Sequence, residues 1–293
     1  MQRALLIYNP TAGRERATKK AAVAETILSD AGWLIDLYAT EQAGDAEKAA
    51  AQAHFDYDTV IASGGDGTLH EVINGIGLGG SNIDLGIIPA GTTNDFARAL
   101  KIPMDVRQAC RVIASGRVQK TDLGSINGRL FINIAGGGIL TNITYEVPSK
   151  LKTYLGQLAY YAKSIEELPR LKPVKVRLAT PEIVFEDEIM LFLTANSSSV
   201  GGFVHLAPGA SLTDGLLDLI VVKRINLAEF LQLAAMALYG DHINHPKVLY
   251  LQTPYVEITS TEIISLNTDG EYAGQLPCKI QAHPQLVNII VPA

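Results

Sequence analysis

The sequence predicts an α/β protein of two domains. The first has an open, mainly parallel sheet in three α/β layers, and the second is β-rich, antiparallel and sandwich-like. The chain has 293 residues, more than one domain usually contains. Apolar runs alternate with helical stretches through about residue 122, which favours a parallel sheet covered on both faces. Later runs are shorter and separated by turn residues, which favours antiparallel strands. We therefore expect domains at 1–122 and 123–293, with the extreme C-terminus packing back on the first domain.

The first domain shows βα order from its beginning. Expected strands are 3–8, 33–39, 59–62 and 85–88, and expected helices are 16–31, one from Asp45, 68–75, and two that begin near Thr93 and Asp105. Residues 75–80 match the pattern GxGxxG, but they follow a helix instead of a strand. We therefore interpret 75–80 as a loop and not as a dinucleotide site.

The second domain carries mostly short strands. Expected strands are 130–135, 174–179, 189–195, 217–222, 255–259, 262–266 and 287–291. Two stretches, 150–168 and 226–239, have helical periodicity and are expected to be insertions.

Composition excludes several classes of protein. Lys plus Arg number 24 against 30 for Asp plus Glu, which gives a net charge of −6 and disfavours binding to nucleic acid. Cys110 and Cys278 have neither metal-site spacing nor a disulfide framework, which fits a reducing cytoplasm. No apolar run approaches the ~20 residues that a transmembrane segment needs. We expect a cytoplasmic protein that is at most peripheral to the inner face of the membrane.

A glycine-rich turn follows the expected strand 59–62. It reads Gly64-Gly65-Asp66-Gly67-Thr68 and leads into a helix. Glycines let the backbone aim N–H groups outward, and a helix N-terminus attracts anions, so this turn predicts a phosphate-binding site. An ordinary strand-to-helix turn is the alternative, because Gly and Asp are common in such turns.

Two further turns follow other strands of the same expected sheet. Residues 9–13 (Asn-Pro-Thr-Ala-Gly) follow the first strand, and 89–95 (Pro-Ala-Gly-Thr-Thr-Asn-Asp) follow the fourth, where we expect Thr92 or Thr93 to cap a helix. Turns at the carboxyl ends of parallel strands meet at one edge, so the three are expected to outline one cleft. The chain contains no GxxxxGK[ST] motif, so backbone N–H groups are expected to hold the phosphates.

The second domain contains two acidic turns. Asp214-Gly215 predicts either a hairpin turn or, with nearby carbonyls, a site for a hard cation. Asp269-Gly270-Glu271 places two carboxylates on one short turn, where one could act as a general base. A solvated acidic turn is the alternative reading of the second motif.

Taken in this order, the five motifs resemble the soluble diacylglycerol kinase catalytic-domain family of bacterial lipid kinases, over nearly the whole chain. The resemblance implies an α/β nucleotide domain, a β-rich lipid domain and an ATP site between them. It implies ATP- and magnesium-dependent phosphorylation of the primary hydroxyl of a lipid, diacylglycerol to phosphatidic acid, at the membrane surface. It also implies a homodimer. A sphingoid base, a monoacylglycerol or a polyprenol would offer a similar hydroxyl.

Matching positions carry the family's site residues onto this chain. Glu271 or Asp269 is implied as the base, with Glu271 favoured, and Asp66 as the carboxylate that faces the phosphates through Mg²⁺. A structural Mg²⁺ is implied at Asp214 with the carbonyls of Ser211 and Leu216. The implied ATP-binding residues are Asn9, Pro10, Thr11, Ala12, Gly13, Thr40, Gly64, Gly65, Asp66, Gly67, Thr68, Leu69, His70, Thr92 and Asn94.

Two features of the sequence depart from the family pattern. His70 stands where the family commonly has Asn, and 136–141 lacks the more usual Phe-Asp.

Two other functions are considered. They are an NAD kinase, which shares the glycine turn but phosphorylates a soluble nucleotide, and a non-catalytic lipid- or nucleotide-binding regulator. Helix 151–168, with its apolar residues and flanking lysines, is expected either to pack in the domain or to meet anionic headgroups.

Overall fold

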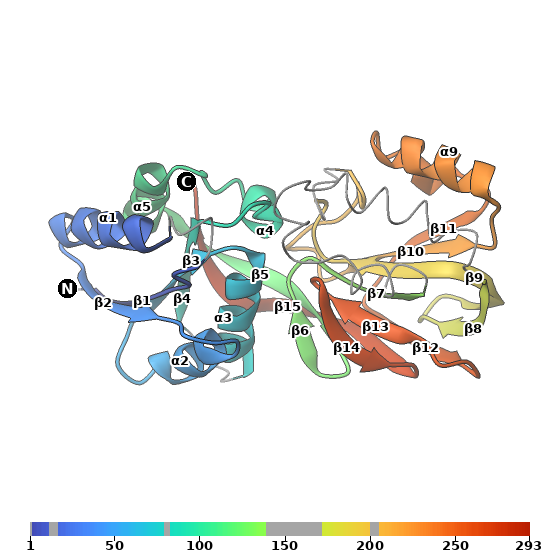
Figure 1. Ribbon diagram of the computed structural model, residues 1–293, viewed down its shortest axis with the longest axis horizontal. Coiled ribbons are helices and arrows are strands. Elements are labelled where there is room, and N and C mark those ends of the chain that lie inside the picture. The colour runs from blue at the N-terminus through green and yellow to red at the C-terminus, as the bar shows by residue number, and fades with distance from the viewer. Residues whose placement is uncertain (1, 12–16, 79–82, 139–171, 200–204) are drawn as a thin grey trace. The chain divides into compact units, whose positions relative to one another are not determined.

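The computed structural model describes residues 2–11, 17–78, 83–138, 172–199 and 205–293 (Figure 1). The chain divides into two compact units, which we call unit 1 (Met1–Leu123 and Pro284–Ala293) and unit 2 (Gly124–His283). The divisions fall inside two strands, β5 (Arg117–Ile126) and β15 (Cys278–Val291). Each of these strands therefore contributes residues to both units. Among the described residues, no helix is both long and apolar enough to cross a membrane.

Unit 1 contains the expected parallel sheet. Its strands are β1 (Arg3–Tyr8), β2 (Leu34–Ala39), β3 (Thr59–Gly64) and β4 (Asp84–Pro89). The order is β4-β3-β1-β2, all parallel, and the end of β15 adds a further parallel strand beside β4 through Asn288 and Ile289. Strands β3 and β4 are buried along almost their whole length, as expected for a sheet covered on both faces. The predicted α/β class is confirmed.

Helices pack on both faces of this sheet. They are α1 (Ala17–Asp30), α2 (Asp45–Ala53), α3 (Asp66–Leu78), α4 (Asp95–Ala99) and α5 (Val106–Ser115). On one face, Ala21 and Ala24 of α1 and Ile113 of α5 form a core with Ile61 and Ile88 of the sheet. Figure 1 shows α2 and α3 on the opposite face.

Helix α3 differs from the sequence prediction at both ends. It begins at Asp66, before the expected Thr68, and it continues to Leu78, so the interpretation of 75–78 as loop is wrong. The reason is helix packing: a Cβ at Gly75 would collide with the Glu47 carbonyl and the Ala50 side chain of α2. Glycine at this position allows the two helices to approach closely, and it does not end α3.

Unit 2 is β-rich and its strands pair antiparallel, including the β5 segment with β6 and the β15 segment with β12. Its sheet runs β14-β13-β7-β9-β8-β12-β15, with β10 on β9, β11 on β10, and β6 paired with β5. The strands are β6 (Arg129–Phe131), β7 (Ile134–Gly138), β8 (Val174–Ala179), β9 (Val184–Ala195), β10 (Leu217–Lys223), β11 (Val248–Thr253), β12 (Tyr255–Ser260), β13 (Ser265–Thr268) and β14 (Glu271–Gln275). The expected strand 130–135 is two strands, interrupted at Ile132 and Asn133, and the expected strand 262–266 begins only at Ser265.

The core of unit 2 consists of buried apolar residues such as Phe131, Phe192 and Ile258. The predicted second helix is present as α9 (Leu227–Ala237), whose N-terminus is closed by a capping box between Asn226 and Glu229. A 3₁₀ helix follows at Asp241–Asn244. The predicted helix 150–168 lies outside the described residues, as do residues 139–141, whereas 136–138 belong to β7.

Two glycines allow the turns after β3 and β4 to touch. A Cβ on Gly91 would collide with the Cα of Gly65, and a Cβ on Gly65 would lie only 3.2 Å from the Cα of Gly91. The backbones also bond directly, since the Ala90 amide donates to the Gly64 carbonyl at 2.8 Å. No side chain separates the two turns, so each fixes the position of the other.

We predict that Gly91→Ala lowers the free energy of unfolding by about 1–3 kcal/mol, because the new methyl group meets main chain that cannot move aside. Urea unfolding followed by circular dichroism measures this loss. Gly67→Ala is the matched control, because a Cβ there meets nothing within 4 Å. This control should be as stable as the wild type or more stable by about 0.5 kcal/mol. Equal stability of Gly91→Ala and wild type would contradict the packing of the two turns.

Candidate active site

The carboxyl edge of the unit 1 sheet brings together the predicted residues of the first domain. Asn9 follows β1, Thr40 follows β2, Gly65 follows β3, and the turn that contains Thr92 follows β4. Main-chain bonds hold this edge together: the Thr40 amide donates to the Tyr8 carbonyl at 2.9 Å. Ala12 and Gly13 lie outside the described residues.

The turn after β1 is closed by its own asparagine. The Asn9 side-chain oxygen accepts hydrogen bonds from the Thr11 amide at 2.9 Å and from the Thr11 hydroxyl at 2.8 Å. This is an Asx turn, in which the side chain substitutes for a backbone acceptor. Asn9 therefore shapes the turn, and Thr11 is exposed at its surface.

The glycine-rich turn places the start of α3 at the same edge of the sheet. Because α3 begins at Asp66, the residues from Asp66 to Leu69 form its first turn. The first N–H groups of a helix have no partner within the helix and carry the positive end of its dipole. Gly67 is exposed, whereas Leu69 and His70 are buried at 4% and 1% exposure. An anion can therefore approach the main chain at Gly67 and Thr68.

Asp66 joins α3 to α4. Its carboxylate accepts a hydrogen bond from the Thr93 hydroxyl at 3.1 Å and one from the Phe96 amide at 3.3 Å. The expectation that Thr92 or Thr93 caps α4 is wrong: Asn94 occupies the N-cap position in a left-handed conformation (φ 51°), and its side chain makes no cap bond. Asp66 caps the helix from another element instead.

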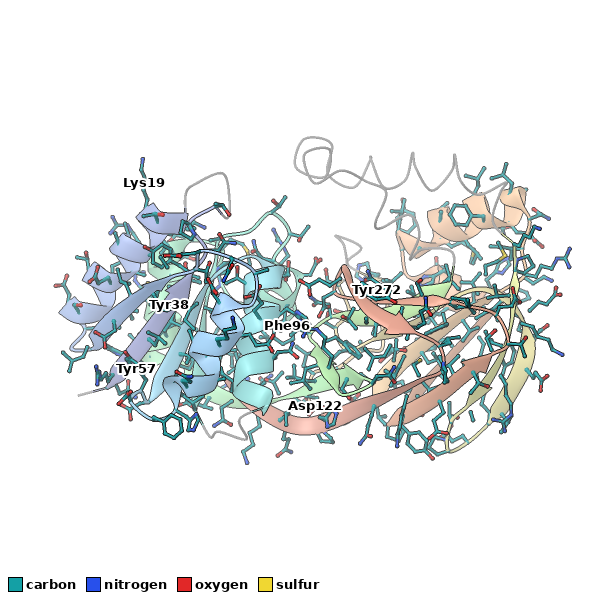
Figure 2. The ribbon with its side chains drawn as sticks, turned by 60° about the horizontal axis from the view of Figure 1, so that its bottom comes forward. Lys19, Tyr38, Tyr57, Phe96, Asp122 and Tyr272 are labelled. Atoms are coloured by element: carbon teal, nitrogen blue, oxygen red, sulfur yellow. The ribbon has the colours of Figure 1, made fainter. Side chains whose placement is uncertain are left out.

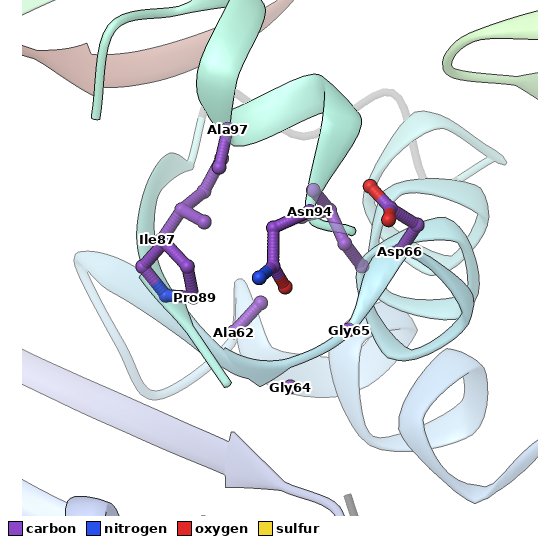
Figure 3. Close-up of a pocket in the computed structure, with 9 residues that line it drawn as sticks. Ala62, Gly64, Gly65, Asp66, Ile87, Pro89, Asn94 and Ala97 are labelled. Atoms are coloured by element: carbon purple, nitrogen blue, oxygen red, sulfur yellow. The ribbon is translucent and has the colours of Figure 1, made fainter. Parts of the chain in front are cut away.

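Asn94 closes the turn after β4. Its side-chain oxygen accepts from the Gly91 amide at 2.9 Å, and its side-chain nitrogen donates to the Gly91 carbonyl at 3.1 Å. A small pocket lies between this turn and the glycine turn, lined by residues that include Gly64, Gly65, Asp66 and Asn94 (Figure 3). Its volume of about 10 Å³ is that of a single water molecule. The pocket is therefore too small to enclose a nucleotide.

In unit 2, Asp269 is a structural carboxylate. Asp269 and Gly270 form the two-residue turn between β13 and β14, both with positive φ (48° and 94°) as in a type I′ hairpin. The Asp269 carboxylate accepts hydrogen bonds from the amides of Ile132 (2.7 Å), Asn133 (2.9 Å) and Ile134 (3.0 Å). These bonds hold the segment between β6 and β7, which explains the interruption of the expected strand 130–135.

Glu271 has a different environment. It is the first residue of β14, its side chain is 49% exposed, and its carboxylate lies 3.5 Å from the guanidinium of Arg129 on β6. A substrate can therefore reach the Glu271 carboxylate, whereas three amide donors occupy the oxygens of Asp269. Of the two carboxylates on this turn, that of Glu271 is the more accessible.

The Asp214 turn presents oxygen atoms. The Asp214 carboxylate accepts from the Leu216 amide at 3.0 Å, and the Ser211 hydroxyl accepts from the Thr213 amide at 3.3 Å. Gly215 has a positive φ of 75°, which closes the turn. Carboxylate and carbonyl oxygens suit hard cations, Mg²⁺ among them. Within the described residues no group of three or more His, Cys, Asp or Glu side chains could hold a metal, so a cation here would depend on main-chain carbonyls.

A buried acid stands next to this turn. Asp218 of β10 is 1% exposed and accepts hydrogen bonds from the Tyr250 hydroxyl and, at 3.4 Å, from Gln252. Burial raises the pKa of Asp218, and the bond from Tyr250 opposes that rise. Gln252 also donates to the Gly209 carbonyl at 3.0 Å, so this group supports the chain that leads into the Asp214 turn.

The sequence analysis missed two charged residues that contact the end of β4 and the turn after it. The Lys20 ammonium donates to the Pro89 carbonyl at 2.6 Å, and the Arg98 guanidinium donates to the Thr93 carbonyl at 2.9 Å. Both cations therefore contact the turn after β4. No motif marks Lys20, because its partner lies 69 residues away in the sequence.

Comparison with known proteins agrees with the resemblance that the motifs carry. A family model described as diacylglycerol kinase catalytic domain matches residues 3–126, and one described as YegS C-terminal NAD kinase beta sandwich-like domain matches residues 140–291. A diacylglycerol kinase from Bacillus subtilis (strain 168) is 48% identical over 100% of this chain and 97% of that protein. One from Staphylococcus epidermidis (strain ATCC 12228) is 44% identical over 99% of this chain and 92% of that protein.

Solved structures agree as well. The crystal structure of a diacylglycerol kinase from Bacillus anthracis str. Sterne has a TM-score of 0.85 to this chain at 28% identity, and covers 99% of this chain and 97% of its own. The similarity in sequence and in fold extends over both units. The chain therefore belongs to the diacylglycerol kinase family.

Proposed function

We propose that this chain is an ATP-dependent lipid kinase that phosphorylates the primary hydroxyl of diacylglycerol to give phosphatidic acid. One observation carries the proposal: relatives that are 44–48% identical over essentially the whole chain are diacylglycerol kinases. The NAD kinase alternative has less support, since these relatives are lipid kinases by name. We further propose that unit 1 binds the nucleotide and that unit 2 binds the lipid.

ATP would bind at the carboxyl edge of the unit 1 sheet. The exposed first turn of α3 offers main-chain N–H groups to the phosphates, and the turns at Asn9, Thr40 and Thr92 border the same edge. Asp66 supplies the carboxylate that would hold Mg²⁺ on the phosphates. When bound, Mg²⁺ neutralises charge on the transferring phosphoryl group.

The proposed base is Glu271. Its carboxylate accepts the proton of the lipid hydroxyl while the hydroxyl oxygen attacks the γ-phosphorus, and the bond from that phosphorus to the bridging oxygen of ADP breaks. Asp269 keeps the turn in place by accepting hydrogen bonds from three backbone amides. Asp214, with the carbonyls of Ser211 and Leu216, is proposed as a structural Mg²⁺ site.

We also propose that the protein acts as a homodimer, peripheral to the inner face of the cytoplasmic membrane, where its lipid substrate is found. Co-sedimentation with phosphatidylglycerol vesicles, with and without diacylglycerol, tests membrane binding. Analytical ultracentrifugation tests the dimer, and a monomer at all concentrations would exclude it.

The proposed activity is tested by transfer of labelled γ-phosphate from ATP. Purified protein is given dispersed diacylglycerol, monoacylglycerol, a sphingoid base, a polyprenol or NAD in parallel, and the products are identified by mass. Label in phosphatidic acid is expected. Label on NAD alone would establish the alternative kinase, and the absence of transfer to every acceptor would favour a non-catalytic regulator.

Asp66→Asn should lower kcat by about 100-fold or more, equivalent to about 3 kcal/mol of activation free energy. The fold should survive, because Asn keeps an oxygen that can accept from the Phe96 amide. Thermal unfolding checks the fold, and steady-state assays measure kcat. Asp84→Asn is the control: this carboxylate lies at the opposite end of β4, accepts from Asn288 at 3.2 Å, and should be dispensable for turnover.

The two carboxylates of the β13–β14 turn should respond differently to substitution. Glu271→Gln should lower kcat by about 10²–10⁴-fold with little change in Tm, as expected for loss of a general base. Asp269→Asn should instead lower the free energy of unfolding by about 1–3 kcal/mol, because one of its oxygens becomes a nitrogen that cannot accept from the amides.

Glu257→Gln, an exposed glutamate of β12, is the control for the loss of a surface charge. The assignment of the base would be reversed if Asp269→Asn abolished turnover at unchanged Tm while Glu271→Gln stayed active.

A further inference from the structure

A cation lies where the turns after β3 and β4 begin. The Lys20 ammonium is 2.6 Å from the carbonyl of Pro89, the last residue of β4. Pro89 pairs with Gly64 of β3, and the Ala90 amide that follows bonds to the Gly64 carbonyl. The half-buried Lys20 side chain therefore reaches from α1 to the joint between the two turns.

A buried hydroxyl on the same face of the sheet is the second observation. Ser63 is 0% exposed, and among the described residues its hydroxyl has no hydrogen-bond partner. Ser63 pairs with Ile88, and residues paired across neighbouring strands share a face. Ile88 belongs to the core that α1 and α5 form on this face, so Ser63 lies on the face of the sheet that these two helices cover. A buried hydroxyl without a protein partner is typical of a place that a water or a ligand completes.

Electrostatics indicate what kind of ligand would bind there. The side chains at the helix starts include two carboxylates, Asp66 and the buried Asp95, which repel an anion. The chain has no P-loop lysine, so a positive charge for a phosphate must come from elsewhere. Lys20 places a positive charge at the carboxyl edge of the sheet, and an ammonium acts on phosphate as a point charge.

We propose that Lys20 and Ser63 form part of the nucleotide site and that the Lys20 ammonium contacts the phosphate chain of ATP. The proposal rests on the proposed function for the identity of the nucleotide. Lys20 is a binding residue, so its charge should act on the affinity for ATP and only slightly on the chemical step.

The test compares Lys20→Met with Lys19→Met. Lys19 is the adjacent residue on the same helix, it is exposed, and Figure 2 shows it pointing away from α1. Calorimetry measures binding of ATP, AMP and inorganic tripolyphosphate to the full-length protein with Mg²⁺ present. Lys20→Met should lower the affinity for ATP and for tripolyphosphate by at least about 10-fold, equivalent to about 1.4 kcal/mol of binding free energy. Its affinity for AMP should stay within about 3-fold of the wild-type value. Lys20→Arg should restore most of the loss, and Lys19→Met should bind as the wild type does.

A purely structural role gives a different result. If Lys20 only ties α1 to β4, Lys20→Met will have a lower Tm with unchanged affinity for ATP and tripolyphosphate, and the proposal is then wrong. Ser63→Ala tests the hydroxyl separately: it should not lower the Tm of the nucleotide-free protein, yet it should reduce the rise in Tm that saturating ATP produces. An undiminished rise would remove Ser63 from the site.

These outcomes are independent of the acceptor. Binding of ATP and tripolyphosphate is measured without lipid, so loss of affinity in Lys20→Met would stand even if the wild type failed to phosphorylate diacylglycerol. Conversely, a wild type that phosphorylates diacylglycerol, together with a Lys20→Met variant of unchanged affinity, would leave the proposed function standing and overturn only the role of Lys20.

Discussion

The contact between the Gly65 and Gly91 backbones is the constraint on which the unit 1 site depends. Because no side chain separates the two turns, Asp66 at the start of α3 is close enough to accept from Thr93 and from the Phe96 amide. Those bonds hold the start of α4, and Asn94 closes the intervening turn on Gly91. A single close approach thus fixes two helix starts and one carboxylate, which is the preorganisation that phosphoryl transfer requires.

In unit 2, the two acidic residues of the β13–β14 turn lie in different environments. Asp269 and Glu271 are two residues apart, yet three backbone amides bind the first and solvent surrounds half of the second. The anchored carboxylate fixes the hairpin turn against the segment between β6 and β7, and the exposed one follows at the start of β14. A general base must be both accessible and held in position, and the proposed role of Glu271 relies on Asp269 to hold the turn.

The parts of the site that the sequence predicts are local, and the parts that it does not predict are contacts between distant residues. Periodicity locates the turns at the carboxyl ends of β1, β3 and β4, since apolar runs and glycine signals are adjacent in sequence. It does not reveal that Gly75 packs against α2, or that Asp269 binds amides 135–137 residues away. It also does not reveal Lys20, and strands β5, β11 and β14 were missed. Polar residues interrupt β5 and β14, whereas β11 carries a short apolar run that the sequence analysis passed over. Tertiary packing decides these features.

Strand β15 completes the sheet that carries the candidate site of unit 1. Asn288 and Ile289 of β15 pair with β4, and Ile290 joins the core formed by Leu6 and Ile61. A fragment that stops near residue 122 would leave β4 as an open edge strand, and edge strands with buried apolar residues tend to pair with other chains. The turn with Gly91 follows β4, so its position depends on a strand that lies about 200 residues further along the sequence. The α/β unit is thus contiguous in space and discontinuous in sequence.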